Sequence, residues 1–487
     1  MSEPSSSTSS EQSSEQSSEQ QSAPSPAAAA APVSGPVSGT SGTQSGTSAS
    51  QQSTPGGPEA PQPPAAPAVT SVPARPDTPD TPAAQVTRGP RTAVPRAGRP
   101  SLLARLRPAA FGAEPTGERL ARVRRSPQFR DGAFRNQRPV GASGSVRQVV
   151  PMIRDALRRA DRVRRKPARA LPIVRPTITS GPPASGLRLT WLGHATVLAE
   201  IDGHRVLFDP VWGERCSPFS FAGPRRLHPV PAPLAALGPY DAIVISHDHY
   251  DHLDMPTVRA LLASDAVFAV PLGVGAHLER WGVPAGRIRE LDWHESTRVR
   301  GLTLTATPGQ HFCGRGVRNV GRTLWASWAV AGGEHRIFHS GDTGYFQGFA
   351  ETGRRLGPFD ATMMQIGAYS EAYWPDIHMT PEEGVRAHLD LSGGTPHGVL
   401  LPIHWATFNL ALHPWEEPAE RTVGEARRAG VTVAVPRPGE SFEPARGLPL
   451  HPWWREVAVP VPGAGTHGAG THGADATEAA LEAPRES

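Results

Sequence analysis

The chain has 487 residues, with 49 Lys and Arg against 45 Asp and Glu and a net charge of +4 at pH 7. Its two cysteines, Cys216 and Cys313, are too few for a disulfide framework. No run of 18 apolar residues occurs, which argues against a transmembrane helix. Of the 49 basic residues only Lys166 is a lysine, so the basic pI reflects an arginine-rich composition and is weak support for a nucleic-acid partner.

The two ends of the chain have compositions unlike that of a folded domain. Residues 1–110 contain no Phe, Trp or Tyr and consist largely of Ser, Pro, Ala, Gly, Thr and Gln, and residues 456–487 repeat Gly-Ala-Gly-Thr-His. Neither segment can bury enough apolar surface to offset its ordering entropy, so we expect both to be disordered tails. We expect the main folded domain at 186–455 and, before it, an Arg-rich extension at 111–185 that packs on this domain.

The extension is strongly basic, since residues 101–175 hold 19 basic and 5 acidic side chains. Within it, Val150 to Lys166 has a helical pattern, with Ile153, Leu157 and Ala160 on one side and arginines around the rest. Such a helix can lie on an anionic membrane surface. It can also pack on the folded domain with its arginines in solvent, and we prefer this second interpretation.

Turn and capping signals then delimit alternating strands and helices. Asp202-Gly203 lies between two apolar runs, which predicts a β-hairpin. Thr-Pro-Glu-Glu is a helix start, because Thr can cap the helix and Pro fits its first turn. Helices are predicted at 255–262, 380–391 and 417–429, and residues 431–435 are predicted to return as a strand. This alternation indicates an α/β fold.

The segment from Ser246 to His252, Ser-His-Asp-His-Tyr-Asp-His, directly follows a short apolar run. A buried strand that ends in such a turn brings several ligands to one point. Imidazole and carboxylate groups suit zinc and other borderline divalent metals. His247 and His249 can converge on one ion, and Asp251 and His252 can face a second one. The pattern therefore predicts a metal site rather than a polar surface loop.

Three more candidate ligands stand near the ends of later apolar segments. They are His311, Asp342 and His404. Each would be a weak signal alone. Together with the earlier segment they make five histidines and two aspartates.

The number and order of these ligands resemble the metallo-β-lactamase-fold hydrolases. Other motifs resemble the branch of N-acyl-phosphatidylethanolamine-hydrolysing phospholipases D: Leu-Thr-Trp-Leu-Gly-His-Ala at 189–195, Leu-Phe-Asp-Pro-Val at 207–211, Gly-Asp-Thr-Gly-Tyr at 341–345, Ile-Gly-Ala-Tyr at 366–369 and Ile-His-Trp-Ala-Thr-Phe at 403–408. The resemblance implies a four-layer αββα sandwich of the metallo-β-lactamase fold, with 186–455 as the catalytic domain and the ligands along one edge.

The resemblance also implies a cofactor of two Zn²⁺ ions, although other divalent metals suit the same ligands. It assigns His247, His249 and His311 to the first ion, Asp251, His252 and His404 to the second, and Asp342 to both. His249 stands where redox-active di-iron relatives carry a carboxylate, which favours hydrolysis. The bridging Asp342 argues against β-lactam cleavage as the main activity.

Such a metal pair, about 3.5–4 Å apart, can share a hydroxide, since zinc lowers the pKa of bound water towards about 7. In a phosphodiesterase this hydroxide would attack phosphorus in line. The predicted catalytic residues are Asp251, Asp342 and His378, the last as a proton donor to the leaving oxygen. A purely structural role at a helix start is equally open for His378.

For the substrate, the branch resemblance implies N-acyl-phosphatidylethanolamine, cut to phosphatidic acid and N-acylethanolamine. An apolar channel would be needed beside the metals. The candidates to line it are Tyr369, Trp374, Trp405 and Phe408, for which core packing is equally open.

Two other functions are compatible with the sequence. A lactonase or other ester hydrolase of the same superfamily would need no lipid channel, and a nuclease would use the Arg-rich segment and bind less tightly at high salt. We expect a phospholipid or other small ester as partner and no nucleic acid, and the sequence leaves a homodimer open. In the absence of a signal-peptide pattern, we expect a cytoplasmic protein that can contact the inner membrane face peripherally.

Overall fold

The computed structural model describes residues 108–140, 151–152, 154–155, 158, 163–178, 181–316 and 319–458. All of them belong to one compact unit. The expected tails, except 108–110 and 456–458, lie outside the described residues. So do eight of the 17 residues of the helix expected from Val150 to Lys166, including the three apolar residues expected on one of its sides.

One mixed sheet has seven strands in the order β15-β3-β4-β5-β6-β7-β8. Its strands run antiparallel from β15 to β5 and parallel from β5 to β8. Their bounds are β3 Leu187–Gly193, β4 Thr196–Ile201, β5 His204–Phe208, β6 Ala242–Val244, β7 Val267–Pro271, β8 Ile288–Leu291 and β15 Ser441–Phe442.

The second mixed sheet has six strands in the order β14-β13-β12-β11-β10-β9. It is antiparallel from β9 to β12 and parallel from β12 to β14. Its strands are β9 Ser296–Val299, β10 Leu302–Thr307, β11 Ser327–Ala331, β12 Arg336–His339, β13 Ala361–Gln365 and β14 Val399–Ile403.

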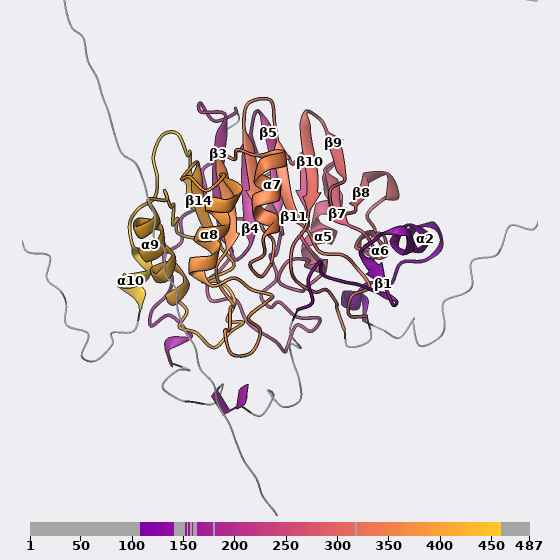
Figure 1. Ribbon diagram of the computed structural model, residues 1–487, viewed down its shortest axis with the longest axis horizontal. Helices are drawn as coiled ribbons and strands as arrows, with labels where there is room; N and C mark the ends of the chain where they lie inside the picture. The colour runs from indigo at the N-terminus through magenta and orange to yellow at the C-terminus, as the bar shows by residue number, and fades with distance from the viewer. Residues whose placement is uncertain are drawn as a thin grey trace, which may run out of the picture. The chain divides into compact units, whose positions relative to one another are not determined.

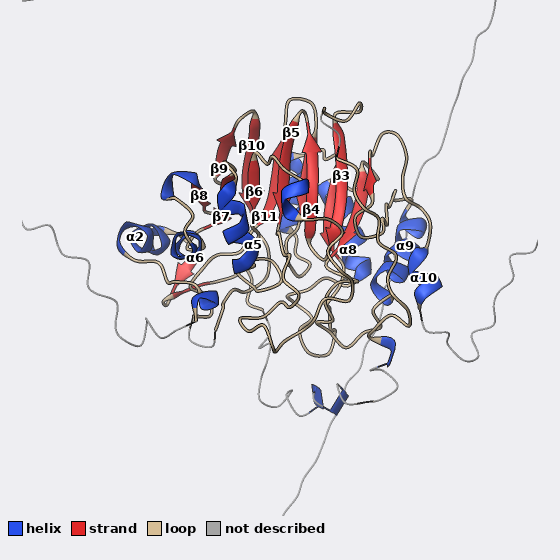
Figure 2. Ribbon diagram, turned by 180° about the vertical axis from the view of Figure 1, so that it is seen from behind, coloured by secondary structure: helices blue, strands red, loops and turns tan. Residues whose placement is uncertain are grey.

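Helices cover the outer faces of both sheets. Figure 1 shows α7 and α8 in front of the six-stranded sheet, with α9 beside them, and Figure 2 shows α5 and α6 over the seven-stranded sheet from behind. The bounds of these helices are α5 Met255–Ala260, α6 Gly275–Trp281, α7 Gly348–Leu356, α8 Pro381–Leu391 and α9 Glu417–Ala429. Other elements near the two ends of the described residues are α2 Gly117–Arg125, β1 Phe129–Arg130, β2 Ala133–Phe134 and α10 Trp453–Val457.

The layers follow from the two-residue period of the strands. On β5, Val206 and Phe208 belong to the core that also contains strand residues of the other sheet, whereas Leu207 packs in a second core with Val258 of α5 and Leu278 of α6. Successive strand residues point to opposite faces, so a fully apolar strand is buried on both sides. The expected four-layer αββα sandwich is confirmed.

Several local predictions are also confirmed. Asp202 and Gly203 have φ values of 48° and 83°, as a tight hairpin turn with two left-handed residues requires. Helix α8 begins with a complete capping box between Thr380 and Glu383. Helix α9 ends at the left-handed Gly430, which caps it.

The strand expected at 431–435 is wrong. These residues form only an isolated bridge, in which Leu400 of β14 donates to the carbonyl of Thr432 and accepts from the amide of Ala434. The next bond of a parallel ladder would need an amide from Pro402, which has none. The pairing therefore stops after one step.

The described part of the extension contacts the main domain. Arg119 of α2 pairs with Glu279 at 2.7 Å and Glu290 at 2.5 Å. Just before the extension, the carbonyl of Ala109 accepts from the indole of Trp281 at 2.8 Å. None of the helices that the structure describes combines the length and hydrophobicity needed to span a bilayer.

Candidate metal centre

The metal-ligand segment follows β6 and Ile245 at the end of the sandwich where the long loops gather (Figure 2). The carboxylate of Asp209, just after β5, holds its first residue, because Oδ1 accepts from the amide of Ser246 at 2.7 Å and Oδ2 from its hydroxyl at 2.6 Å. On the other side, the buried Arg315 donates to the carbonyls of Asp248 at 2.6 Å and Leu253 at 2.8 Å. The loop is thus fixed from both flanks.

The first cluster of candidate ligands is formed by His247, His249, His311 and Asp342. His249 Nδ1 lies 2.8 Å from His247 Nε2 and 3.3 Å from His311 Nε2. Asp342 Oδ2 lies 3.8 Å from both His247 Nε2 and His311 Nε2. Tetrahedral nitrogen ligands of zinc, with bonds of about 2.0–2.1 Å, are separated by about 3.3 Å. These spacings suit one ion.

The second cluster contains Asp251, His252 and His404, together with the same oxygen of Asp342. Asp342 Oδ2 lies 3.1 Å from His252 Nε2 and 3.0 Å from His404 Nε2. Asp251 Oδ2 lies 3.5 Å and 3.3 Å from the same two nitrogens. All seven residues singled out in the sequence therefore lie together, with Asp342 between the two clusters.

Several buried nitrogen and oxygen atoms that could bind a metal at this centre have no hydrogen-bond partner in the protein. They include Nε2 of His252 and His404 and Oδ1 of Asp342. A buried polar atom without a partner costs free energy, so such atoms indicate a ligand that the protein chain does not supply. The clusters fit a dinuclear metal site on this ground as well as on distance.

The electrostatics follow from burying acids and bases together. Burial raises the pKa of Asp342, but His252 and His404 outweigh it and hold this pKa well below its usual range. Burial lowers the pKa of His404, but the carboxylates of Asp342 and Asp251 raise it to about 9. Burial and the imidazole of His252 hold the pKa of His247 well below its usual range. The negative charge of the buried carboxylates and the positive charge of the buried imidazoles thus offset one another.

A family model described as the beta-lactamase superfamily domain matches residues 204–405. An uncharacterized protein of Mycobacterium tuberculosis is 52% identical over 350 residues, which cover 72% of this chain and 92% of that protein. The N-acyl-phosphatidylethanolamine-hydrolyzing phospholipase D 1 of Caenorhabditis elegans is 38% identical over 46% of this chain and 65% of that protein. Its mitochondrial namesake in Saccharomyces cerevisiae is 29% identical over 48% of this chain and 50% of that protein.

The chain belongs to the metallo-β-lactamase superfamily. Its buried histidine and aspartate clusters and this membership make it a metal-dependent hydrolase of the superfamily.

The ligand histidines of this metallo-β-lactamase-fold protein are oriented by bonds from their second ring nitrogens. Nδ1 of His252 lies 2.8 Å from Asp209 Oδ2, and Nδ1 of His311 lies 3.0 Å from the carbonyl of Ile377. Both partners only accept, so both rings carry the proton on Nδ1 and leave Nε2 free for a metal. Asp209 was part of a recognised motif, and its position at a strand end was the signal that could have assigned it to the site.

His194 is a second site residue that sequence reasoning placed in a motif but not in the site. Its Nε2 lies 2.9 Å from Asp251 Oδ2, and it is fully buried. Its backbone carbonyl accepts from the amide of His404 at 3.0 Å. His194 and His404 both have a left-handed backbone conformation, with φ of 55° and 68°. In residues other than glycine this strained conformation is found mostly at functional sites.

The extension contributes Asn136 to the centre. Its side chain donates to the carbonyl of His311 at 2.8 Å and accepts from the amide of His311 at 3.0 Å. This pair of bonds fixes the backbone of a ligand that otherwise stands on a loop after β10. A side-chain amide is the group that can satisfy both backbone atoms at once.

We expect Asn136→Ala to lower the free energy of unfolding by about 1–3 kcal/mol, because two backbone groups lose their partner. Metal affinity at the first cluster should fall about 10–100-fold, as is usual when a group that orients a ligand is removed. Urea unfolding and zinc titration measure the two effects. Arg138→Ala, which removes an exposed bond to Gln347 from the same segment, is the control and should change neither. Equal behaviour of the two variants would contradict this role.

His378 lies beside the metal clusters. Its Nε2 is 3.9 Å from Asp342 Oδ2, its ring stands edge-on to that of His311, and it is partly exposed. Burial lowers its pKa to about 4, although Asp342 acts in the opposite direction. Its role as a proton donor stays a prediction.

The four predicted substrate contacts have different surroundings. Phe408 stands edge-on to His194 with ring centroids 5.2 Å apart, and Trp374 donates to the carbonyl of Ala368 at 2.7 Å. Tyr369 stacks on His413 and bonds Glu417 of α9. Trp405 is 3% exposed and stacks on Trp191 inside a group of indoles. A cavity of about 20 Å³ that Trp405 and Phe408 line beside His404 is too small for an acyl chain. These contacts stay predictions.

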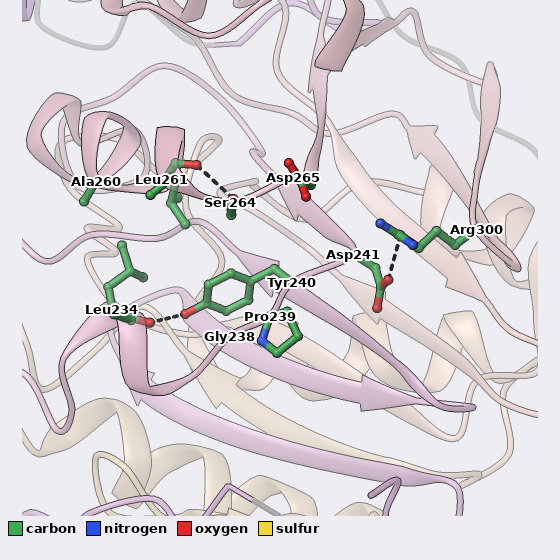
Figure 3. A pocket seen from close by; sticks show the side chains of 12 residues that line it. Leu234, Gly238, Pro239, Tyr240, Asp241, Ala260, Leu261, Ser264, Asp265 and Arg300 are labelled. Atoms are coloured by element: carbon green, nitrogen blue, oxygen red, sulfur yellow. Dashed lines mark hydrogen bonds and ion pairs between the residues drawn. The ribbon is translucent and has the colours of Figure 1, made fainter. Parts of the chain in front are cut away.

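A larger cavity, of about 680 Å³, lies at the opposite end of the strands (Figure 3). It is bordered by Asp241 and Asp265, which precede β6 and β7, and by Arg300, which pairs with Asp241 at 3.0 Å. No predicted site residue is among those that line it. This cavity has no part in the metal centre.

Proposed function

We propose that this protein is a dinuclear zinc phosphodiesterase that cleaves N-acyl-phosphatidylethanolamine-type phospholipids into phosphatidic acid and N-acylethanolamine. The observation that carries the proposal is the pair of clusters sharing Asp342 Oδ2, at spacings that suit two ions. Two relatives that bear the name of this phospholipase D, at 38% and 29% identity, support the substrate class.

A bound zinc pair supplies a water molecule acidified to a pKa of about 7 and positive charge beside the phosphate. The chain's own residues provide the geometry. Asp342 holds the two clusters at a fixed separation, and Asp209 and the carbonyl of Ile377 fix the histidine tautomers. These bonds are made before substrate arrives, so little reorganisation is needed during the reaction.

On the open side of the centre, the partly exposed groups are His249, Asp251 and His378. His378 is not among the seven ligands, so its imidazole is free to hydrogen-bond the oxygen of the departing N-acylethanolamine. That oxygen becomes an alkoxide when its bond to phosphorus breaks, and a nearby N–H donor stabilises the developing charge.

The test combines metal content with product analysis on the full-length protein. N-acyl-phosphatidylethanolamine in mixed micelles is incubated with protein carrying two equivalents of zinc, and the products are followed by mass spectrometry. We expect phosphatidic acid and the matching N-acylethanolamine in equal amounts, lost on chelation and restored by zinc.

Intact lipid in the presence of two bound metals would overturn the phospholipase D assignment while leaving a metal-dependent hydrolase. Release of diacylglycerol or fatty acid would overturn it as well, because a different bond would have been cut. Turnover of lactones by such a preparation would then favour the alternative of a lactonase.

A further inference from the structure

The segment between β5 and β6 carries a hairpin-like loop, residues 214–226, which we call the aromatic hairpin. Its base is closed by a bridge between Arg215 and Arg225 and by the bond from the amide of Cys216 to the carbonyl of Pro224. Near its tip, Gly223 has a φ of 99° and packs so closely on Ser217 that no Cβ would fit. The hairpin is therefore a built turn and not a loose loop.

The tip of the aromatic hairpin presents apolar rings to solvent. Phe221 is 80% exposed and Phe219 is 40% exposed, with their rings 5.4 Å apart. Residues 216–224 contain no charged side chain. Exposing two adjacent phenylalanines at one tip is unfavourable in water, so this arrangement indicates a surface that is covered when the protein works.

The exposed rings continue towards the metal centre. Phe219 contacts Phe111, whose ring lies 6.5 Å from that of Tyr250, the neighbour of the ligand His249. Phe312, next to the ligand His311 in sequence, is 39% exposed, and its ring lies 4.8 Å from the imidazole of His249. The apolar surface thus borders the partly exposed side of the clusters.

Positive charge stands directly behind the apolar tip. Residues 214–226 hold three arginines and one glutamate, but the guanidinium of Arg226 is buried and donates to the carbonyls of Val211 and Gly213, so the cationic groups near the surface are Arg215 and Arg225. The guanidinium of Arg215 donates along the hairpin to the carbonyl of Gly223 at 2.6 Å, and the exposed Arg225 pairs with Glu214. An apolar tip with cationic groups at its base matches acyl chains lying beneath anionic phosphate groups.

We propose that the aromatic hairpin docks the protein on an anionic phospholipid bilayer, with Phe219 and Phe221 inserted between the lipids and with Arg215 and Arg225 at the phosphates. The proposal rests on the proposed function, because a phospholipid substrate is the reason to bring a bilayer to this side of the metal centre. A second copy of the chain is a poorer occupant. Two phenylalanines offer about 150–250 Å² each, whereas a stable protein interface buries about 800 Å² per partner.

The experiment is vesicle co-sedimentation of the full-length protein. Vesicles are made of phosphatidylcholine alone or of equal parts of phosphatidylcholine and phosphatidylglycerol. Full burial of one phenylalanine is worth roughly a tenfold change in affinity or more. We therefore expect the double variant Phe219→Ser, Phe221→Ser to bind the anionic vesicles at least tenfold more weakly. Wild-type binding should be tighter to anionic than to neutral vesicles and should weaken with salt.

The matched control is Leu450→Ser, which removes another exposed apolar side chain, 70% exposed before α10. It should bind vesicles like the wild type. Thermal unfolding and two bound metals per chain verify that the double variant is folded. Equal vesicle binding by wild type and double variant would overturn the proposal, as would a double variant that changes oligomeric state in gel filtration, because a second copy would then be the occupant.

Lipid turnover separates this inference from the proposed function. If wild-type protein cleaves the micellar lipid but the double variant still binds vesicles fully, docking by the hairpin is wrong and the phosphodiesterase stands. If vesicle binding depends on the hairpin but no lipid is cleaved, the docking surface stands and the substrate assignment is wrong.

Discussion

Asp342→Asn is expected to lower turnover by about 10³-fold or more, which corresponds to about 4 kcal/mol of transition-state stabilisation. One carboxylate oxygen of Asp342 faces five imidazoles at 3.0–3.9 Å. The side-chain amide of asparagine has no negative charge to offset the two metal cations. Its NH₂ group is a hydrogen-bond donor and replaces one of the two carboxylate oxygens. Metal content should fall below two equivalents per chain.

The measurement is metal analysis after gel filtration together with hydrolysis of the lipid at saturating concentration. Asp265→Asn is the matched control, since this carboxylate borders the cavity at the other end of the strands and is exposed. It should retain both metals and full turnover. An Asp342→Asn protein with near-normal rate would contradict the role of this residue as the shared ligand.

His194→Ala is expected to weaken the second metal about 10–100-fold while leaving the first in place. The ring of His194 donates to Asp251, and its backbone carbonyl accepts from the amide of His404. Asp251 and His404 are ligands of the second cluster only, so the effect should be confined to the second metal. Alanine keeps the backbone bond but removes the one to Asp251. It also leaves a void among buried rings, which should lower stability by a few kcal/mol.

Zinc titration monitored by calorimetry should resolve two sites in the wild type and one tight and one weak site in His194→Ala. His194→Gln can still place a donor near Asp251 and should recover part of the second affinity, which a merely structural role would not predict. His335→Ala is the control, because that histidine pairs with Asp202 in a turn far along the sheet. Uniform weakening of both metals would contradict the selective role of His194.

The sequence by itself determined the fold class, the local turns and the ligand types. The hairpin at Asp202-Gly203 and the cap at Thr380 depend on neighbouring residues only, because backbone angles and local hydrogen bonds decide them. The ligands could be chosen because they stand at the ends of apolar strands, which converge at one edge when the strands stack.

Only the tertiary structure decided the features that depend on residues far apart in the chain. Asn136 meets His311 across 175 positions, and His194 meets Asp251 across 57, so no spacing signal links them. The predicted strand at 431–435 stops after one bridge because its neighbour in space carries Pro402. Likewise Trp405, next to a ligand in sequence, packs among indoles, because adjacent residues after a strand can point to opposite faces.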